Sequence, residues 1–328
     1  MNTLDAPLHK NMSLDTPVVL IIFNRPDTTE KVFDTISQAQ PKKLLVVADG
    51  PRIDRPNEAE KCAAARAIID RVDWKCEVLT NYSETNLGCK YRVSTGLDWV
   101  FSQVEEAIII EDDCLPSPSF FYFCQTLLER YRDDERIMHI SGNNFQFGQS
   151  RTEHSYYFSK YNHIWGWASW RRAWKHYDVE MKTWEECKEA KMLNSVCNDI
   201  YEQAYWSDIF DRVHQGFIDT WDYQWTYACW AQSGLSILPN VNLITNIGFG
   251  ADATHTTEIS KLANLPAVNI SVIERPSFVI RHHDADSFTF NYIFNEVRME
   301  PNNYSSVNAR IKNAKQYIKD MLSKLSYS

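Results

Sequence analysis

Three consecutive carboxylates, Glu111, Asp112 and Asp113, follow an uninterrupted apolar run at residues 107–110. Adjacent carboxylates repel one another unless a cation or a positive side chain compensates their charge. Mg²⁺ and Mn²⁺ prefer oxygen ligands and typically join protein carboxylates to the phosphates of a substrate. Most acidic triplets are solvated turns, but this one leads into a proline-containing turn at residues 114–118. The triplet therefore predicts a divalent cation site for a phosphate-bearing ligand.

Histidines supply the other candidate metal ligands. His255 lies in a glycine-rich stretch, and a neutral imidazole suits Mn²⁺ better than Mg²⁺. A hydrogen-bonded surface histidine is an equal alternative for this residue. His282 and His283, beside two aspartates, form a second-choice cluster, and a polar turn is the alternative there. The predicted ligands of a Mn²⁺ or Mg²⁺ ion are therefore Asp113, Asp112 and His255.

Apolar runs that alternate with helical patterns place the carboxylates at one edge of a predicted sheet. The runs that predict strands are residues 18–23, 44–48, 74–79, 107–110 and 137–140. The helices predicted between them are residues 27–40, 57–72, 88–104 and 118–131. This alternation is typical of a parallel sheet with right-handed crossovers. We therefore predict an α/β fold in which a ligand binds beyond the carboxyl ends of the strands.

Polar or turn-forming residues follow the first three predicted strands. They are, in chain order, Asn24 and Arg25, then Asp49 and Gly50, then Asn86, Leu87 and Gly88. Two basic side chains, Lys90 and Arg92, come next. Glycine allows backbone N–H groups to approach phosphate oxygens closely. The sequence has no Walker A motif and no GxGxxG after the first strand, which argues against a P-loop enzyme and a dinucleotide-binding protein.

The order of these motifs resembles that of the GT-A glycosyltransferases. The apolar strand, Glu-Asp-Asp, a turn with proline and a helix that opens with Phe120 and Phe121 resemble the DXD region of that fold. The similarity is closest to the N-acetylglucosaminyltransferase I type and its bacterial relatives. It extends in order through most of residues 17–256, where residues 245–256 resemble a late loop that closes on metal and diphosphate. The resemblance implies a GT-A Rossmann-like, mostly parallel sheet flanked by helices.

The resemblance also implies roles for individual residues. Asp49 resembles the aspartate that reads the uracil edge, which favours a UDP-sugar. The residues implied in nucleotide-sugar binding are Phe23, Asn24, Arg25, Asp49, Gly50, Asn86, Gly88, Arg92, Glu111 and Asp112. Those implied in acceptor binding are Trp165, Gly166, Trp167 and Trp221.

Asp222, in the segment Trp221-Asp222-Tyr223-Gln224-Trp225, is the candidate general base. Inverting sugar transfer needs a carboxylate that accepts the proton of the acceptor hydroxyl as its oxygen attacks the sugar. The flanking Trp221 and Trp225 would desolvate this carboxylate and raise its basicity. Two alternatives are an N-cap for the following helix and an ion-pair partner for an arginine.

Composition narrows the class of protein further. The net charge of −9 disfavours general binding to nucleic acids, because a basic surface is needed to displace their counterions. The 11 Trp, 16 Tyr and 16 Phe suit sugar stacking, although a dense core is the better explanation for most of these rings. None of the eight cysteines forms a CxxC pair, so we expect reduced thiols.

The organisation predicted is one catalytic domain with two tails. Residues 16–290 form it, as a nucleotide-binding half (16–145) and a mixed, acceptor-side half (146–290), after a loose tail at 1–15. The C-terminal tail, 291–328, contains an amphipathic helix with a basic face. This helix either docks on the domain or lies on a membrane surface. No signal peptide or membrane-spanning run is apparent, which predicts a cytoplasmic protein, with the inner membrane face as the contact if the tail binds lipid.

Taken together, these features predict a metal-dependent glycosyltransferase of the hexosyltransferase class that acts in polysaccharide biosynthesis. It would move a sugar from a nucleotide sugar, UDP-linked by preference, to a hydroxyl of a glycan or lipid-linked acceptor. One alternative is a sugar-phosphate nucleotidyltransferase, but those enzymes usually carry a glycine-rich basic loop where this chain has Asn24-Arg25-Pro26. The other is a non-catalytic, carbohydrate-binding relative.

Overall fold

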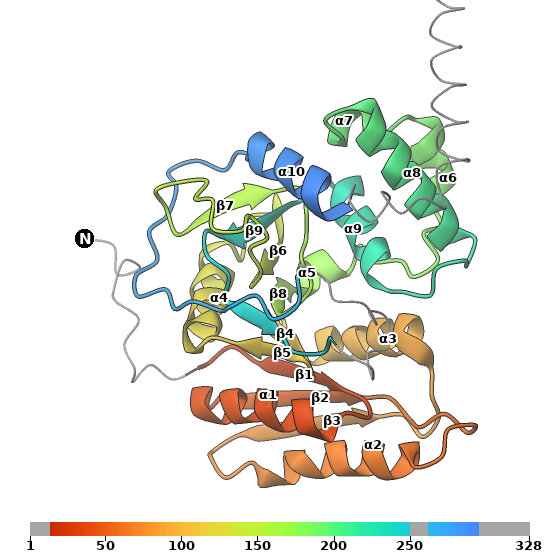
Figure 1. Ribbon diagram of the computed structural model, residues 1–328, viewed down its shortest axis with the longest axis vertical. Coiled ribbons are helices and arrows are strands. Elements are labelled where there is room, and N and C mark those ends of the chain that lie inside the picture. The colour runs from red at the N-terminus through yellow and green to blue at the C-terminus, as the bar shows by residue number, and fades with distance from the viewer. Residues whose placement is uncertain (1–13, 250–261, 295–328) are drawn as a thin grey trace, which may run out of the picture. The chain divides into compact units, whose positions relative to one another are not determined.

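The computed structural model describes residues 14–249 and 262–294. Contacts within the chain group it into two units, Met1–His283 and Asp284–Ser328. The first unit is built on an eight-stranded, mostly parallel sheet with helices packed on it (Figure 1). The predicted α/β class is therefore confirmed.

The strands and helices alternate along the first half of the chain as predicted. The strands are β1 (Val18–Ile22), β2 (Lys43–Ala48), β3 (Glu77–Tyr82), β4 (Glu106–Glu111), β5 (Cys114–Pro116), β6 (Ile137–Ser141), β7 (Tyr156–Ser159), β8 (Trp167–Trp170), β9 (Leu235–Pro239) and β10 (Ile244–Asn246). The helices are α1 (Pro26–Ala39), α2 (Glu58–Ala67), α3 (Gly88–Gln103), α4 (Pro118–Arg130), α5 (Arg171–Trp174), α6 (Trp184–Glu189), α7 (Leu193–Val196), α8 (Ile200–His214), α9 (Asp222–Ala231) and α10 (His283–Thr289). A 3₁₀ turn, η1 (Ile68–Arg71), follows α2, and a π-helical turn, η2 (Phe290–Phe294), follows α10.

The large sheet has the strand order β3-β2-β1-β4-β8-β6-β9-β7. Its first four strands are parallel, and the apolar runs of β1, β2 and β4 are buried on both faces because helices cover both sides, whereas the edge strand β3 is only partly buried. β8 runs antiparallel between β4 and β6, and β7 runs antiparallel at the far edge. A second, two-stranded sheet pairs β5 with β10 and so ties the segment after Asp113 to the segment before Gly248.

Alternate strand residues face two different cores. Leu44 and Val46 of β2 belong to a largely aliphatic core with residues of α1 and α4. On the opposite face, Val47 of β2 packs against Gly96 of α3, where an added Cβ would overlap the valine side chain. Further along that face, Trp174 of α5 lies 5.2 Å from Trp225 of α9 between ring centroids. On this face, α5 and α9 therefore pack against β8 and each other through aromatic rings.

Several boundaries differ from those predicted. The third strand begins at Glu77 instead of residue 74, because Trp74 packs on the Phe33 ring and donates from Nε1 to Pro41 O (2.9 Å). Residues 198–232 form two helices, α8 and α9, separated by a loop at residues 215–221. The short strands β7 and β8 were not predicted, and the segment of β8 was interpreted only as part of the acceptor side.

All eight cysteines lie within the described ranges and are free thiols. Among the residues described, no helix combines the length and the apolar character that crossing a bilayer requires. In the second unit, the rings of Phe288 and Tyr292 stack with centroids 4.3 Å apart. The predicted tail helix at residues 307–325 lies outside the described residues and stays a prediction.

Candidate active site

A cavity of about 440 Å³ opens beyond the carboxyl ends of β1, β2 and β4. The start of α3, the loop before α9 and the segment after β10 complete its wall. Most of the predicted site residues line it, namely Phe23, Arg25, Asp49, Asn86, Gly88, Arg92, Glu111, Asp112, Asp113, Trp165, Trp221 and Asp222. The structure therefore brings both predicted halves of the site to one cavity.

The acidic triplet is held by the end of β1. The backbone N–H of Phe23 donates to Asp112 Oδ2 (3.1 Å). The Arg25 guanidinium lies 3.5 Å from Asp112 Oδ1 and 3.0 Å from Asp113 Oδ2. These ion pairs are possible because β1 and β4 are adjacent and parallel, so that their carboxyl ends coincide. Arg25, which was predicted to contact the nucleotide, thus also compensates part of the acidic charge.

One guanidinium does not balance the three carboxylates. Burial, followed by the charges of Asp113, Asp112 and Asp222, raises the pKa of Glu111 to about 8. Burial also raises the pKa of Asp112 to about 7, against the opposing effect of Arg25. A group whose charged form is this disfavoured marks a place where further positive charge would stabilise the structure.

These residues fit a hard divalent cation that a substrate helps to bind. Within residues 14–249 and 262–294, no three acidic, histidine or cysteine side chains gather closely enough to hold a metal by themselves. Mg²⁺ usually takes only one or two protein carboxylates and completes its coordination with water and substrate phosphates. Asp113 is the more accessible of the two predicted aspartate ligands, with 14% of its side chain exposed against 6% for Asp112. His255, the third predicted ligand, lies outside the described residues.

Gly248 forms the opposite wall of the acidic cluster. A Cβ added at this position would overlap the carboxylate of Asp113 and come within 2.8 Å of an Arg25 nitrogen. The backbone N–H of Ile247 donates to Asp113 O (2.8 Å), which holds the segment in this position. Only glycine therefore lets the chain approach the carboxylates so closely.

Asp49 organises the loop that precedes α3. Its carboxylate accepts hydrogen bonds from the backbone N–H groups of Gly50 (2.9 Å), Leu87 (2.9 Å) and Gly88 (3.1 Å). The side-chain Nδ2 of Asn86 adds a fourth, at 3.0 Å. Burial raises the pKa of Asp49 despite these donors. Protein groups thus already engage both oxygens, and the predicted contact with a uracil edge would be an additional one.

Other residues of the predicted nucleotide-binding set support the loops around the cavity. Arg92 donates from one terminal nitrogen to Asn81 O (2.9 Å) and Asn81 Oδ1 (2.6 Å). Asn24 donates to Glu58 Oε1 (2.9 Å) and lines a neighbouring hollow instead of the main cavity. Gly50 also lies outside the cavity lining, where an added Cβ would come within 2.5 Å of the Thr85 backbone.

Asp222 faces the same cavity from the start of α9. It is the first residue of the helix, and the N-cap is Trp221, which makes no side-chain capping hydrogen bond. Thr220 Oγ1 donates a hydrogen bond to Asp222 Oδ1. The predicted alternative that Asp222 is the N-cap of this helix is therefore wrong, because the capping position belongs to its neighbour.

The tryptophans of the predicted acceptor side divide into wall and core. Trp165 is half-buried, lines the cavity and meets the Phe249 ring edge-on at 5.6 Å between centroids. Trp167 is fully buried, does not line the cavity and stacks on Trp221 at 5.7 Å. Gly166 is also absent from the lining, and its positive φ of +66° serves the turn into β8. Direct acceptor contact by Trp167 and Gly166 was therefore a wrong expectation.

His282, of the second-choice histidine cluster, lies away from the cavity, and several residues that line the cavity were not predicted. His282 Nε2 lies 2.9 Å from Arg151 O, and this histidine is not part of the cavity lining. The lining residues that sequence reasoning missed include Arg52, Cys89, Ile164 and Thr220, whereas Gly248 and Phe249 belong to the predicted late loop at residues 245–256. A signal existed for Arg52 and Cys89, because each lies within three residues of a predicted strand-end position.

Comparison with known proteins gives limited information. No protein-family model matches the chain, and no curated protein matches it. Among solved structures, 4-diphosphocytidyl-2C-methyl-D-erythritol synthase from Anaerococcus prevotii DSM 20548 is 12% identical, with a TM-score of 0.31 over 60% of this chain and 85% of that one. UDP-glucose pyrophosphorylase complexed with UDP-glucose is 11% identical, with a TM-score of 0.33 over 68% of this chain and 90% of that one. These values are too low to assign a family or an activity.

Proposed function

We propose that this protein is a metal-dependent glycosyltransferase that uses a nucleotide sugar, with UDP as the preferred nucleotide. One observation carries the proposal: the acidic strand end at Glu111–Asp113 and the carboxylate of Asp222 face a single cavity. The two sites lie close enough for the charge of Asp222 to contribute to the raised pKa of Glu111. A charge-compensating site for a diphosphate beside a separate carboxylate base is what transfer of a sugar to a hydroxyl requires.

The donor would lie along the strand ends. Arg25 and Arg92 offer positive charge to a nucleoside diphosphate, and the loop held by Asp49 lines the same end of the cavity. A divalent cation held by Asp113 and Asp112 would supply charge compensation for the departing diphosphate. Holding the sugar between the proposed cation site and Asp222 would provide much of the rate enhancement, because the two reacting groups would already be oriented and would not have to meet in solution.

The reaction proposed is a direct displacement. The acceptor hydroxyl oxygen forms a bond to the anomeric carbon as the bond from that carbon to the diphosphate oxygen breaks. Asp222 accepts the hydroxyl proton, and the nucleoside diphosphate leaves with the bonding electron pair. Attack from the side opposite the leaving group inverts the anomeric configuration. The acceptor would be a glycan or lipid-linked hydroxyl that enters between Trp165 and the loop before α9.

A nucleotidyltransferase would place a different group in the same cavity. That reaction breaks a bond at phosphorus and releases or consumes pyrophosphate. The segment after β1 is Asn24-Arg25-Pro26, and Pro26 is already the first residue of α1. Arg25 in this segment is engaged with Asp112 and Asp113. Where a nucleotidyltransferase would carry a glycine-rich phosphate loop, this chain therefore has an arginine that pairs with the acidic cluster. This difference favours sugar transfer.

A turnover assay separates the three candidate functions. The full chain is incubated with Mn²⁺, a panel of UDP-, GDP- and CDP-sugars and mixed glycan acceptors, and both nucleoside diphosphate and pyrophosphate are measured. Release of UDP that depends on an acceptor supports the proposal. Pyrophosphate exchange would identify a nucleotidyltransferase, whereas tight binding without turnover would identify a carbohydrate-binding relative. Titration calorimetry with UDP, GDP and CDP tests the uracil assignment, and a preference for GDP contradicts it.

A further inference from the structure

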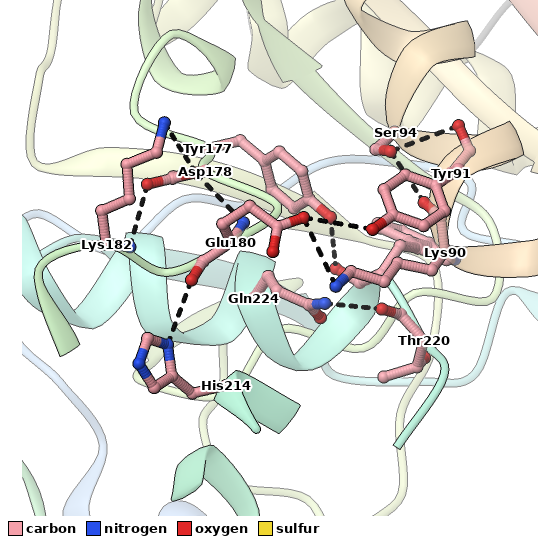
Figure 2. Close-up of polar contacts among 11 residues, drawn as sticks. Lys90, Tyr91, Ser94, Tyr177, Asp178, Glu180, Lys182, His214, Thr220 and Gln224 are labelled. Atoms are coloured by element: carbon pink, nitrogen blue, oxygen red, sulfur yellow. Dashed lines mark hydrogen bonds and ion pairs between the residues drawn. The ribbon is translucent and has the colours of Figure 1, made fainter. Parts of the chain in front are cut away.

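The loop that carries the proposed base is held by three side chains outside the acidic cluster. Tyr177 donates from its hydroxyl to Trp221 O (3.1 Å), and Gln224 donates from Nε2 to Thr220 O (2.6 Å). Thr220 then donates from Oγ1 to Asp222 Oδ1. Figure 2 shows Gln224, on α9, in contact with Thr220 of this loop, and Tyr177 on a separate segment nearby. Two consecutive carbonyl groups and the carboxylate itself are therefore fixed by side-chain donors.

Gln224 makes its hydrogen bond at a cost to the fold. Its side chain is fully buried on α9, and its Oε1 has no hydrogen-bond partner among the described residues. A buried acceptor without a partner destabilises the folded state, and an apolar side chain at this position would avoid that penalty. A residue that lowers stability while it holds a loop beside a cavity is better explained by function than by packing.

The segment that contains Tyr177 also contacts α3, on the proposed donor side of the cavity. The Tyr177 ring stacks on Trp174 at 4.2 Å between centroids, and the next few residues contact α3. Glu180 accepts from Tyr91 Oη (3.2 Å) and lies 3.6 Å from Lys90 Nζ, as Figure 2 shows. Lys90 and Tyr91 belong to the first turn of α3, which lines the nucleotide end of the cavity. The loop of the base is thus braced against the helix beside the donor.

We propose that Thr220, Gln224 and Tyr177 are positioning residues that hold the Asp222 carboxylate in the direction of the acceptor. The inference rests on the proposed function, since it presupposes that Asp222 accepts a proton. Thr220 acts on the carboxylate directly, whereas Gln224 and Tyr177 act through the backbone of Thr220 and Trp221. None of the three is required to touch either substrate.

The hydroxyl of Thr220 is tested with a pair of variants of nearly the same size. Thr220→Val removes the donor and should lower kcat about tenfold, with donor KM and melting temperature unchanged. Thr220→Ser keeps the hydroxyl and should restore most of the rate. Thr35→Val on α1, which removes a comparable threonine hydroxyl far from the cavity, is the matched control and should behave as wild type. Equal kcat values for the valine and serine variants would overturn the proposed role.

Gln224 is tested by separating stability from rate. Gln224→Leu removes the unpaired oxygen together with the donor, so melting temperature should hold or rise while kcat falls several-fold. A fall in melting temperature with unchanged kcat would show a structural role only and would overturn the proposal for this residue.

A double-mutant cycle tests whether Thr220 acts through the base. If Thr220 acts through Asp222, Thr220→Val should have no further effect on the residual rate of Asp222→Asn, because coupled residues are not additive. Additive losses would contradict the positioning role while leaving sugar transfer intact. Absence of acceptor-dependent turnover in the wild-type chain is a separate result, which would overturn the proposed function and this inference together.

Discussion

The two walls of the cavity are built by different means. On the proposed donor wall, the parallel strands β1, β2 and β4 end in charged or polar residues, and these strand ends line the cavity. On the acceptor wall, the loop at residues 219–222 and Trp165 lie over an aromatic cluster in which Trp167, Trp174 and Trp225 pack within 6.3 Å of one another.

Under the proposed function, this difference separates nucleotide binding from catalysis and acceptor binding. The donor wall carries the acidic triplet and the arginines, whose positions follow from adjacent strands of a rigid sheet. The acceptor wall carries Asp222 on a loop whose orientation depends on side-chain hydrogen bonds and on the rings beneath it. Changes on the donor wall should therefore alter nucleotide affinity, whereas changes on the acceptor wall should alter kcat, the KM for the acceptor or the fold.

The largest effect is expected from Asp113→Ala on the donor wall. Removing this carboxylate takes away a predicted metal ligand and leaves Arg25 without one of its partners. Turnover and Mn²⁺-dependent nucleotide binding should both be nearly lost, with the melting temperature close to wild type. Calorimetry with UDP and Mn²⁺, beside a rate assay, gives the measurement. Full activity of the wild-type chain in EDTA would contradict the metal requirement.

The matching change on the acceptor wall is Asp222→Asn. It preserves the size of the side chain but removes the proton acceptor, so kcat should fall by about 10²–10⁴-fold. Nucleotide affinity should remain unchanged, because the donor contacts lie on the other wall. The rate is measured together with UDP affinity and melting temperature. A loss of nucleotide affinity similar to that of Asp113→Ala would show that the two walls do not act separately.

The tryptophans test whether wall and core are distinct. Trp167→Ala removes a fully buried ring and should cost about 3–5 kcal/mol of unfolding free energy. Trp165→Ala removes a half-buried wall ring, so the main effect should be a higher KM for the acceptor with a smaller loss of stability. Urea unfolding and acceptor titrations on the two variants provide the comparison. An equal stability loss in both would place Trp165 in the core as well.

An effect that is smaller per pH unit is expected from the buried histidines beneath the acceptor wall. His139 Nδ1 accepts from Trp225 Nε1 (3.2 Å), so the ring hydrogen is on Nε2, which faces His163 O at 3.0 Å. Burial lowers the pKa of both His139 and His163 to about 3. The unfolded chain therefore binds these protons first, and stability should be lost as the pH falls from about 6.5 towards 3.

Each histidine should contribute a slope of about 1.4 kcal/mol per pH unit within that window. Urea unfolding between pH 7 and pH 4 measures the slope for the wild-type chain. Because carboxylates titrate in the same range, the informative value is the difference from His163→Phe, which should have the shallower slope. Identical slopes would mean that His163 is already accessible to protons in the folded state.

The first half of the fold could be predicted from the sequence because its signals are local. The run at residues 107–110 is apolar, the carboxylates follow it directly, and β4 ends at Glu111. The same holds for the polar residues after β1 and β2, whose positions at one sheet edge follow from the parallel order. The strand-end side of the cavity could therefore be predicted from the positions of the strands and from the rule that parallel strands end at the same edge of a sheet.

Contacts between distant segments could not be predicted in the same way. Trp165 and Trp167 are two residues apart and chemically identical, yet β8 directs the second into the core while the first stays on the cavity wall. The pairing of Arg25 with Asp112 and Asp113 depends on the neighbouring positions of β1 and β4. Three of the four groups that donate to Asp49 belong to a loop that starts nearly forty residues later.

The position of β8 between β4 and β6 has a consequence for synthesis of the chain on the ribosome. The four parallel strands and their helices are complete by residue 111, but β4 then has only β1 beside it. Its other side remains an unpaired edge until Trp167–Trp170 has emerged and paired with it. An apolar edge of this kind is a template for pairing with another nascent chain. The interval between these two segments is therefore the stage of translation at which a chaperone would protect the chain most.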